Sequence, residues 1–289
     1  MKPRSEARCD CVLGIFFSLC LGAVLAAHAQ ETLQLQRQDH PRIQAMAYAP
    51  ASATCRGIGI ISPGAGGTEK GYRYLGESLS ALGYLAVVVD HQESGRLAVG
   101  EHVGRKGLRE GLAELITTPD AYRGRFLDIA AAKRWAQDRC ESSQSVLIGH
   151  SMGAATAMIE AGARSKVGVQ GTDSFNVYIA LSPQGTGLIF SENAWSEIRK
   201  PVLLLTGTQD TELGGASWET RTEPFKNMPP GCKWLGVIDG SSHLNFAGIG
   251  RSRNTEALTA LTIGNFLDAL DRGDCPSPAP VKGMALSSK

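Results

Sequence analysis

The fold of this chain is decided by the stretch Ser145-Val146-Leu147-Ile148-Gly149-His150-Ser151-Met152-Gly153-Ala154-Ala155-Thr156-Ala157. It reads as an apolar strand, a sharp turn with the pattern G-x-S-x-G, and a helix of small residues. The glycines two positions before and after Ser151 remove side chains where a strained turn would clash, so the serine hydroxyl projects alone above the sheet. A glycine-rich turn with a solvated serine is the alternative, but the flanking strand and helix favour a nucleophile.

On both sides of this stretch, apolar runs of strand length alternate with amphipathic segments of helix length. This alternation is typical of an α/β fold, so we expect a mostly parallel central sheet with helices on both faces. Strands are expected at residues 57–62, 84–90, 145–150, 177–182, 202–206 and 234–239, and helices at 69–82, 119–138, 154–163, 218–227 and 254–270. The first of these helices would have Thr68 as its N-cap.

Three segments lack such a clear pattern. Residues 32–50 alternate only briefly, which is compatible with one or two edge strands. Residues 91–118 carry scattered glycine and charge without periodicity, and we expect a long loop over the active face. The last segment, 276–289, is rich in Pro, Ser, Ala and Gly, and we expect a disordered tail there.

The first 29 residues have the pattern of a secretory signal peptide. Basic residues within positions 2–8 precede an apolar stretch at 11–27, and Ala27-His28-Ala29 forms an A-x-A cleavage site. A membrane anchor is the rival interpretation, but the stretch is shorter than the ~20 residues that a spanning helix needs. We therefore expect cleavage after Ala29, a secreted or periplasmic location, and one domain over residues 30–275.

Four cysteines remain after the expected cleavage, and an even number in an exported protein suggests two disulfides. Cys55 and Cys140 each stand just before an expected strand, whereas Cys232 precedes the last strand and Cys275 follows the last helix. Of the three possible pairings, these positions favour Cys55 with Cys140 and Cys232 with Cys275. The chain has no C-x-x-C motif, so a zinc or thioredoxin-like site has little support.

A serine hydroxyl needs a base to accept its proton and an acid to orient that base. Asp210 follows the strand expected at 202–206, and His243 follows the one at 234–239, in the chain order serine, acid, histidine. Carboxyl ends of parallel strands gather at one edge, where ligands bind. Asp239 is the competing acid and His91 the competing histidine. Asp239 closes its own strand and His91 lies upstream of the serine, so both are less favoured.

Acyl transfer places negative charge on the former carbonyl oxygen, which two backbone N–H groups can stabilise. Met152 directly follows the serine and supplies one of them. The loop after the first core strand supplies the other, and Ala65 is the candidate. The rival interpretation of this loop is a phosphate cradle, but both glycine-rich phosphate motifs fail at Glu69. The balance of 29 basic and 28 acidic residues gives no indication of nucleic acid.

These residues together resemble an α/β-hydrolase, and more narrowly the secreted branch with dienelactone-hydrolase-like proteins, platelet-activating-factor acetylhydrolases and bacterial cutinases or polyester hydrolases. The similarity spans about residues 48–270 and rests on Pro63-Gly64-Ala65-Gly66-Gly67, Gly149-His150-Ser151-Met152-Gly153, Leu205-Thr206-Gly207-Thr208-Gln209-Asp210 and Gly240-Ser241-Ser242-His243. The resemblance implies a Ser151, Asp210 and His243 triad, Ala65 and Met152 as oxyanion donors, and no cofactor or metal.

The resemblance also implies a disulfide between the C-terminal helix and the last strand region, as in cutinase-like members, which fits Cys232 with Cys275. One departure is Ala65, which stands where polyester hydrolases often carry an aromatic residue. We expect a secreted serine esterase that cleaves small or polymeric esters through an acyl-enzyme, without a nucleic-acid partner or a membrane span. The alternatives are a lipid, polyester or amide hydrolase of the same fold, and a catalytically inactive scaffold that only binds.

Overall fold

A computed structural model of the chain describes residues 30–39 and 42–289, so the signal peptide expected over 1–29 lies outside the described residues. One mixed sheet runs through this part of the chain, in the order β1-β2-β4-β3-β5-β6-β7-β8-β9. Its strands are β1 Gln30–Leu35, β2 Ile43–Tyr48, β3 Gly57–Ser62, β4 Tyr84–Val89, β5 Ser145–His150, β6 Val177–Leu181, β7 Val202–Gln209, β8 Lys233–Ser242 and β9 Met284–Ser288.

The parallel centre of the sheet confirms the expected fold class. Strands β3 to β8 all run in the same direction. The segment 32–50, for which one or two edge strands were expected, contributes β1 at the edge of the sheet and β2 between β1 and β4, both joined by antiparallel pairing. All six expected core strands are present. The last two are longer than expected, because β7 and β8 continue together as far as Gln209 and Ser242.

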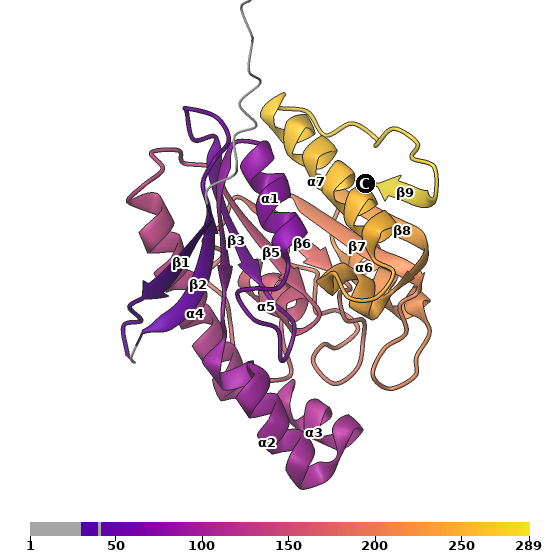
Figure 1. The fold of residues 1–289 in the computed structure, drawn as a ribbon. Helices are drawn as coiled ribbons and strands as arrows, with labels where there is room; N and C mark the ends of the chain where they lie inside the picture. Colours follow the sequence, from indigo (N-terminus) through magenta and orange to yellow (C-terminus); the bar gives the residue numbers. More distant parts are fainter. Residues whose placement is uncertain (1–29, 40–41) are drawn as a thin grey trace, which may run out of the picture.

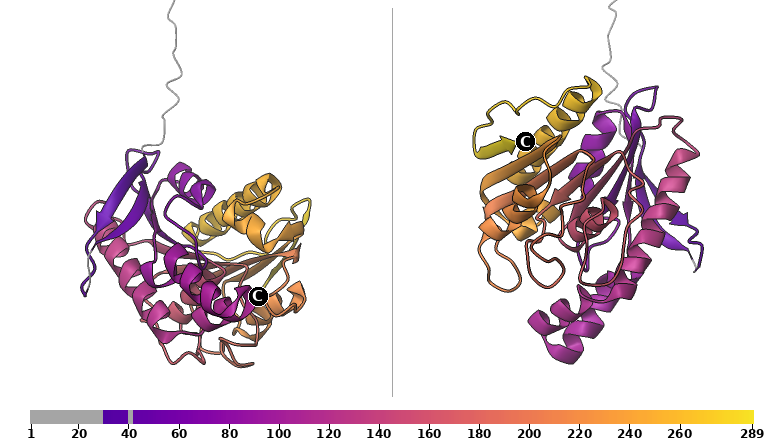
Figure 2. Two further views of the ribbon diagram at one scale, coloured as in Figure 1. Left: turned by 60° about the horizontal axis from the view of Figure 1, so that its bottom comes forward. Right: turned by 180° about the vertical axis from the view of Figure 1, so that it is seen from behind.

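Helices cover both faces of the sheet (Figures 1 and 2). One face carries α4 Pro119–Gln137 and α5 Met152–Glu160, and the other carries α1 Arg73–Ala81 and α7 Arg253–Asp271. Each face has its own apolar core: in β5, Leu147 packs in the core beneath α4 and α5, whereas Ile148 packs in the core beneath α1 and α7. A strand buried on both sides has to be apolar throughout, which explains the continuous apolar runs.

Two helices begin at a different residue than the sequence indicates. Helix α1 starts at Arg73 and not at Glu69, because Tyr72 takes the left-handed conformation with φ of 59° and the chain from 63 to 71 is needed as a loop. Helix α5 starts at Met152, directly after the serine, and not at Ala154. The helix expected at 218–227 is a 3-10 turn, η2 Trp218–Thr222, followed by α6 Glu223–Asn227 with Pro224 in its first turn.

The segment 91–118 is helical, so the expectation of a long loop was wrong. It contains the short turn η1 Gln92–Ser94, then α2 Arg96–Lys106 and α3 Leu108–Leu115, which together form a hairpin that extends beyond the body of the molecule (Figure 1). Helix α2 buries none of its residues. A helix without a buried apolar stripe has no amphipathic pattern, which is why periodicity missed it.

The C-terminal segment is also ordered where we expected disorder over 276–289. Strand β9 pairs antiparallel with β8, from Met284 opposite Ile238 to Ser288 opposite Trp234. This pairing covers the outer edge of β8, which would otherwise leave a row of backbone groups exposed. Composition alone does not reveal it, because β9 is held by backbone pairing with β8 and only Met284 and Leu286 among its side chains are large and apolar.

The structure contains the two disulfides that the sequence favours. Cys55 is bonded to Cys140 across a separation of 85 residues, with the Cα atoms 5.6 Å apart. Cys232 is bonded to Cys275 across 43 residues, with a Cα separation of 5.5 Å. The first bond links the segments that enter β3 and β5, and the second links the start of β8 to the chain just after α7.

Replacing Cys55 and Cys140 together with serine should lower the free energy of unfolding by about 2–5 kcal/mol, because the unfolded chain regains the freedom of a long closed loop. Urea denaturation of the double variant against the oxidised parent measures this loss. The Cys232 and Cys275 double variant is the matched comparison, and its shorter loop predicts a slightly smaller loss. Identical unfolding midpoints in all three proteins would contradict the prediction.

Candidate active site

Ser151 occupies a sharp turn between β5 and α5. Its backbone has φ of 55° and ψ of −119°, a region that costs a non-glycine residue on the order of 1–3 kcal/mol. The flanking glycines make the turn possible: a Cβ on Gly149 would collide with the Gly153 carbonyl, and a Cβ on Gly153 would collide with the Ser62 carbonyl. The strained turn therefore presents the hydroxyl of Ser151 at the carboxyl end of β5.

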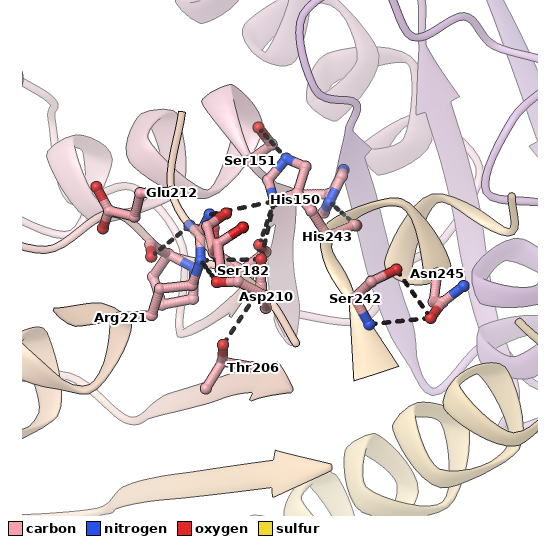
Figure 3. Close-up of polar contacts among 12 residues, drawn as sticks. His150, Ser151, Ser182, Thr206, Asp210, Glu212, Arg221, Ser242, His243 and Asn245 are labelled. Atoms are coloured by element: carbon pink, nitrogen blue, oxygen red, sulfur yellow. Dashed lines mark hydrogen bonds and ion pairs between the residues drawn. The ribbon is translucent and has the colours of Figure 1, made fainter. Parts of the chain in front are cut away.

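The structure brings Ser151, His243 and Asp210 together at the carboxyl ends of β5, β8 and β7 (Figure 3). The Ser151 Oγ lies 3.0 Å from His243 Nε2, and His243 Nδ1 lies 3.0 Å from Asp210 Oδ1. The Asp210 carboxylate is fully buried, while the His243 side chain is 32% exposed. The imidazole therefore connects a buried negative charge with a hydroxyl at the surface.

Two further hydroxyls hold the free oxygen of Asp210. Ser182 Oγ lies 2.6 Å and Thr206 Oγ1 2.9 Å from Asp210 Oδ2, and a carboxylate can only accept, so both hydroxyls donate to it. Ser182 Oγ is also 2.7 Å from His243 Nδ1. Because the single proton of Ser182 points at Asp210, the proton between Ser182 and His243 belongs to Nδ1. That tautomer leaves Nε2 free to accept a proton from Ser151.

Arg221 is a buried arginine that supports the same carboxylate. Its Nε lies 2.9 Å from Asp210 Oδ1, and its guanidinium donates to the backbone carbonyls of Ser182 and Thr211. Burial alone would raise the pKa of Asp210, but the hydrogen bond from His243 and the charge of Arg221 outweigh it and bring that pKa below its ordinary value. Asp210 is therefore ionised at neutral pH.

His243 is held by the turn that it begins, η3 His243–Ala247. Ser242 and Asn245 form a capping box at the start of this turn, with the Ser242 amide donating to Asn245 Oδ1 at 2.9 Å. From α1, the Tyr74 hydroxyl donates to the Phe246 carbonyl at 2.9 Å. The backbone position of the imidazole is thus set by contacts from two separate elements.

The candidate oxyanion donors lie on either side of the elbow. Met152 is the first residue of α5, where a helix leaves its N–H groups without intrahelical partners. Ala65 follows Gly64, and a Cβ on Gly64 would lie 3.2 Å from the Cβ of Ser151, so this loop lies against the nucleophile. Within the described residues, the amides of Ala65 and Met152 have no hydrogen-bond acceptor, whereas the Gly66 amide donates to the Ser94 carbonyl at 2.8 Å.

Solved structures of similar fold include three hydrolases. An esterase from Pyrococcus furiosus has a TM-score of 0.56 at 16% identity, with 83% of this chain and 92% of that chain covered. A predicted CIB-like hydrolase from Thermoplasma acidophilum has 0.53 at 17%, covering 82% and 99%. A dienelactone hydrolase from Anabaena variabilis has 0.56 at 16%, covering 83% and 97%. The chain has the α/β-hydrolase fold. No protein-family model and no curated protein matches the sequence.

The two competing candidates lie elsewhere in the structure. Asp239 is exposed where β8 extends past its apolar part, and its backbone amide bonds to Gly283. His91 is buried in a second Ser-His-Asp set, with Ser62 Oγ 2.8 Å from its Nε2 and Asp128 Oδ2 2.8 Å from its Nδ1. All three side chains of this set are closed off from solvent, so no substrate reaches them.

The buried set is part of a larger polar network that supports the candidate oxyanion loop, the loop that carries Ala65. Arg125 on α4 donates to the Pro63 carbonyl at 2.7 Å, to Ser62 at 3.2 Å and to Ser94 at 2.9 Å. Arg37 joins Asp128 at 3.1 Å. We call these residues the Arg125 network, and it fixes the carbonyl that immediately precedes Gly64 and Ala65.

The sequence did not point to three groups in the candidate site: Ser182, Thr206 and Arg221. Ser182 follows β6 at the same carboxyl-end edge as Ser151, Asp210 and His243, and Thr206 lies on β7 four residues before Asp210. Their positions at or near the ends of expected strands could therefore have identified both. Arg221 had no such position, because a single arginine in the polar segment after β7 looks like a solvated surface residue.

Proposed function

We propose that this protein is a serine hydrolase that cleaves carboxylic esters through an acyl-enzyme intermediate. The observation that carries the proposal is the continuous series of hydrogen bonds from Ser151 through His243 to the buried Asp210. A serine hydroxyl in this arrangement gains a base with the correct tautomer and a fixed orientation.

In the proposed reaction, Ser151 attacks the ester carbonyl while His243 Nε2 takes its proton. Asp210 stabilises the resulting imidazolium, and the amides of Ala65 and Met152 donate to the oxyanion. His243 then protonates the leaving alcohol. A water molecule, deprotonated by the same nitrogen, attacks the acyl-enzyme and releases the acid and free Ser151.

An ester is favoured over an amide by the solved structures of similar fold, which include an esterase and a dienelactone hydrolase, an enzyme named for a cyclic ester. The surface chemistry favours apolar ester groups. Leu213 and Leu244 are exposed and come three residues after Asp210 and one after His243, respectively. We propose that these side chains contact the acyl or alcohol part of an apolar ester.

We also propose that the enzyme acts outside the cytoplasm, secreted or periplasmic. The pattern at residues 1–29 and the two disulfides support this location, because disulfides persist in oxidising compartments. Among the described residues, no helix has the length and apolar character needed to cross a membrane.

The purified enzyme should hydrolyse p-nitrophenyl acetate, butyrate and octanoate, with a higher kcat/KM for butyrate or octanoate than for acetate because of the exposed leucines. The matching butyryl anilide should be turned over much more slowly. A fluorophosphonate probe should label the protein once, on the peptide that carries Ser151, and mass spectrometry locates the adduct.

Three results would each exclude one part of the proposal. Absence of both labelling and turnover would indicate an inactive scaffold. Labelling together with faster cleavage of the anilide would indicate an amidase. A preference for acetate over the longer esters would remove the proposed role of Leu213 and Leu244 while leaving the esterase assignment in place.

A further inference from the structure

A second set of hydrogen bonds connects the candidate oxyanion loop with the backbone of His243. The Gly64 amide donates to the Tyr72 hydroxyl at 3.0 Å, and this hydroxyl lies 2.8 Å from His150 Nδ1. On the other side of the same ring, His150 Nε2 lies 3.1 Å from the His243 carbonyl oxygen. His150, in the middle of this connection, is the neighbour of Ser151 in the chain.

The donor and the acceptor of each hydrogen bond in this connection follow from the two groups at its ends. A carbonyl only accepts, so His150 Nε2 carries the proton and donates to His243. In a neutral ring Nδ1 then accepts, and the Tyr72 hydroxyl donates to it while accepting from Gly64. The Tyr72 hydroxyl and the His150 ring thus each make one donation and one acceptance, while the Gly64 amide only donates and the His243 carbonyl only accepts.

The surroundings keep both side chains in the protonation states that this pattern requires. Burial, and then the nearby His243, lower the pKa of His150 well below its ordinary value, so the ring stays neutral. Burial raises the pKa of Tyr72 to about 12, so the hydroxyl keeps its proton. The rings of His150 and His243 are 4.9 Å apart between centroids.

We propose that Tyr72 and His150 form a positioning pair that holds the oxyanion loop and the His243 backbone at fixed places on either side of Ser151. The inference rests on the proposed function and extends it to two residues that do not touch the reacting atoms. The left-handed backbone of Tyr72, with φ of 59°, supports it, because this conformation is uncommon for a residue with a large side chain. Local strain of this kind persists where the surrounding structure needs it.

The consequence for catalysis is geometric. Gly64 precedes Ala65, whose amide is a candidate oxyanion donor, and the loop is also held from α4 by the Arg125 network through the Pro63 carbonyl. The Tyr72 hydroxyl holds the other end of the same peptide group, because the Gly64 N–H is bonded to the Pro63 carbonyl carbon. Since oxyanion donors act only when they are aimed at the developing charge, a small rotation of this peptide weakens transition-state binding more than substrate binding.

Tyr72→Phe removes one oxygen atom and keeps the ring, so it interrupts the connection at its centre. We expect kcat for p-nitrophenyl butyrate to fall about 10- to 100-fold with KM nearly unchanged, since one complete oxyanion donor is worth about 10²–10³ and a misplaced one loses part of that. The rate constant for labelling by a fluorophosphonate should fall in parallel.

Tyr178→Phe is the matched control. The Tyr178 hydroxyl also accepts from a backbone amide, that of Phe175 at 3.2 Å, and lies 2.9 Å from Asp173. Tyr178 pairs with Val202 at the amino end of β6, opposite the edge that carries Ser151. This variant should lower the thermal midpoint and leave kcat as in the parent. Equal losses of kcat in both variants would overturn the proposal, because the effect would then be a general loss of stability.

A double-mutant cycle tests whether the two residues act as a unit. Combining Tyr72→Phe with His150→Leu should lower kcat no further than the more damaging single change. Additive losses would overturn the proposal. If His150→Leu does not fold, the comparison of Tyr72→Phe with Tyr178→Phe decides alone.

The same measurements separate the two levels of the argument. A parent protein that neither turns over esters nor reacts with the probe refutes the proposed function and this inference with it. A parent that is active, with Tyr72→Phe equally active, refutes only the positioning role.

Discussion

Replacing Ser151 with alanine should lower kcat for p-nitrophenyl butyrate by about 10⁶-fold, the scale seen when the nucleophile of a serine hydrolase is removed. The change deletes the atom that forms the acyl-enzyme and leaves the elbow intact, because the glycines that permit the turn are untouched. Steady-state kinetics measures the loss, and circular dichroism and the thermal midpoint should match the parent.

Residual activity in this variant has to be separated from a contaminating esterase. A contaminant's activity would be abolished by preincubation with the fluorophosphonate, to which a variant without the serine should be inert. Turnover that resists the probe and remains within about tenfold of the parent would rule out Ser151 as the nucleophile, since the oxyanion hole alone cannot supply it.

Replacing Asp210 with asparagine should lower kcat by about 10⁴-fold, because the amide no longer selects the His243 tautomer with the proton on Nδ1. The same variant should lose about 3 kcal/mol of unfolding free energy, since Arg221 would keep a buried charge without its carboxylate partner. Kinetics should therefore be measured well below the midpoint determined by circular dichroism.

Asp239→Asn is the control for the choice of acid. Asp239 is exposed on the extension of β8, so its replacement should leave both kcat and stability close to those of the parent. A large loss of kcat in Asp239→Asn with little loss in Asp210→Asn would reverse the assignment of the acid. The pair of variants decides between the two aspartates that the sequence left in competition.

The central strands of the sheet could be predicted from the sequence, because parallel strands buried on both faces are continuous apolar runs. Runs such as Val146-Leu147-Ile148 are apolar on both faces, and this one is followed directly by a helix, α5. The turn at Ser151 could be predicted for a related reason, because a side chain at Gly149 or Gly153 would collide with nearby backbone. Features of this kind depend on residues that are close together in the chain, so a short stretch of sequence is enough to predict them.

Features that depend on contacts with residues far away in the chain could not be predicted from the sequence. Strand β9 forms by pairing with the edge of β8, and the residues Met284–Ser288 do not by themselves indicate that such an edge is present. The start of α1 depends on Tyr72, which a helical pattern would include but which takes a left-handed conformation. Helix propensity alone cannot anticipate such a tertiary requirement.

The candidate site divides in the same way. Ser151, Asp210 and His243 could be placed by chain order and strand ends, and the structure brings them within hydrogen-bonding distance. Their partners could not be placed, because Arg221 and Tyr72 act through contacts 11 and 78 residues away in the chain, with Asp210 and His150 respectively. His150 could be placed in the turn next to Ser151, but the sequence does not indicate that its ring lies buried between Tyr72 and His243.

The α2–α3 hairpin has a consequence for how much sequence change this fold tolerates. The hairpin leaves and rejoins the body at neighbouring points, because Ser94 before it bonds to Arg125 after it, and His91 bonds to Asp128. The two junctions are thus fastened to each other independently of the residues between them. Insertions, deletions or a different segment between these junctions would therefore leave the contacts of Ser94 with Arg125 and of His91 with Asp128 in place, so the hairpin is an exchangeable piece of this fold.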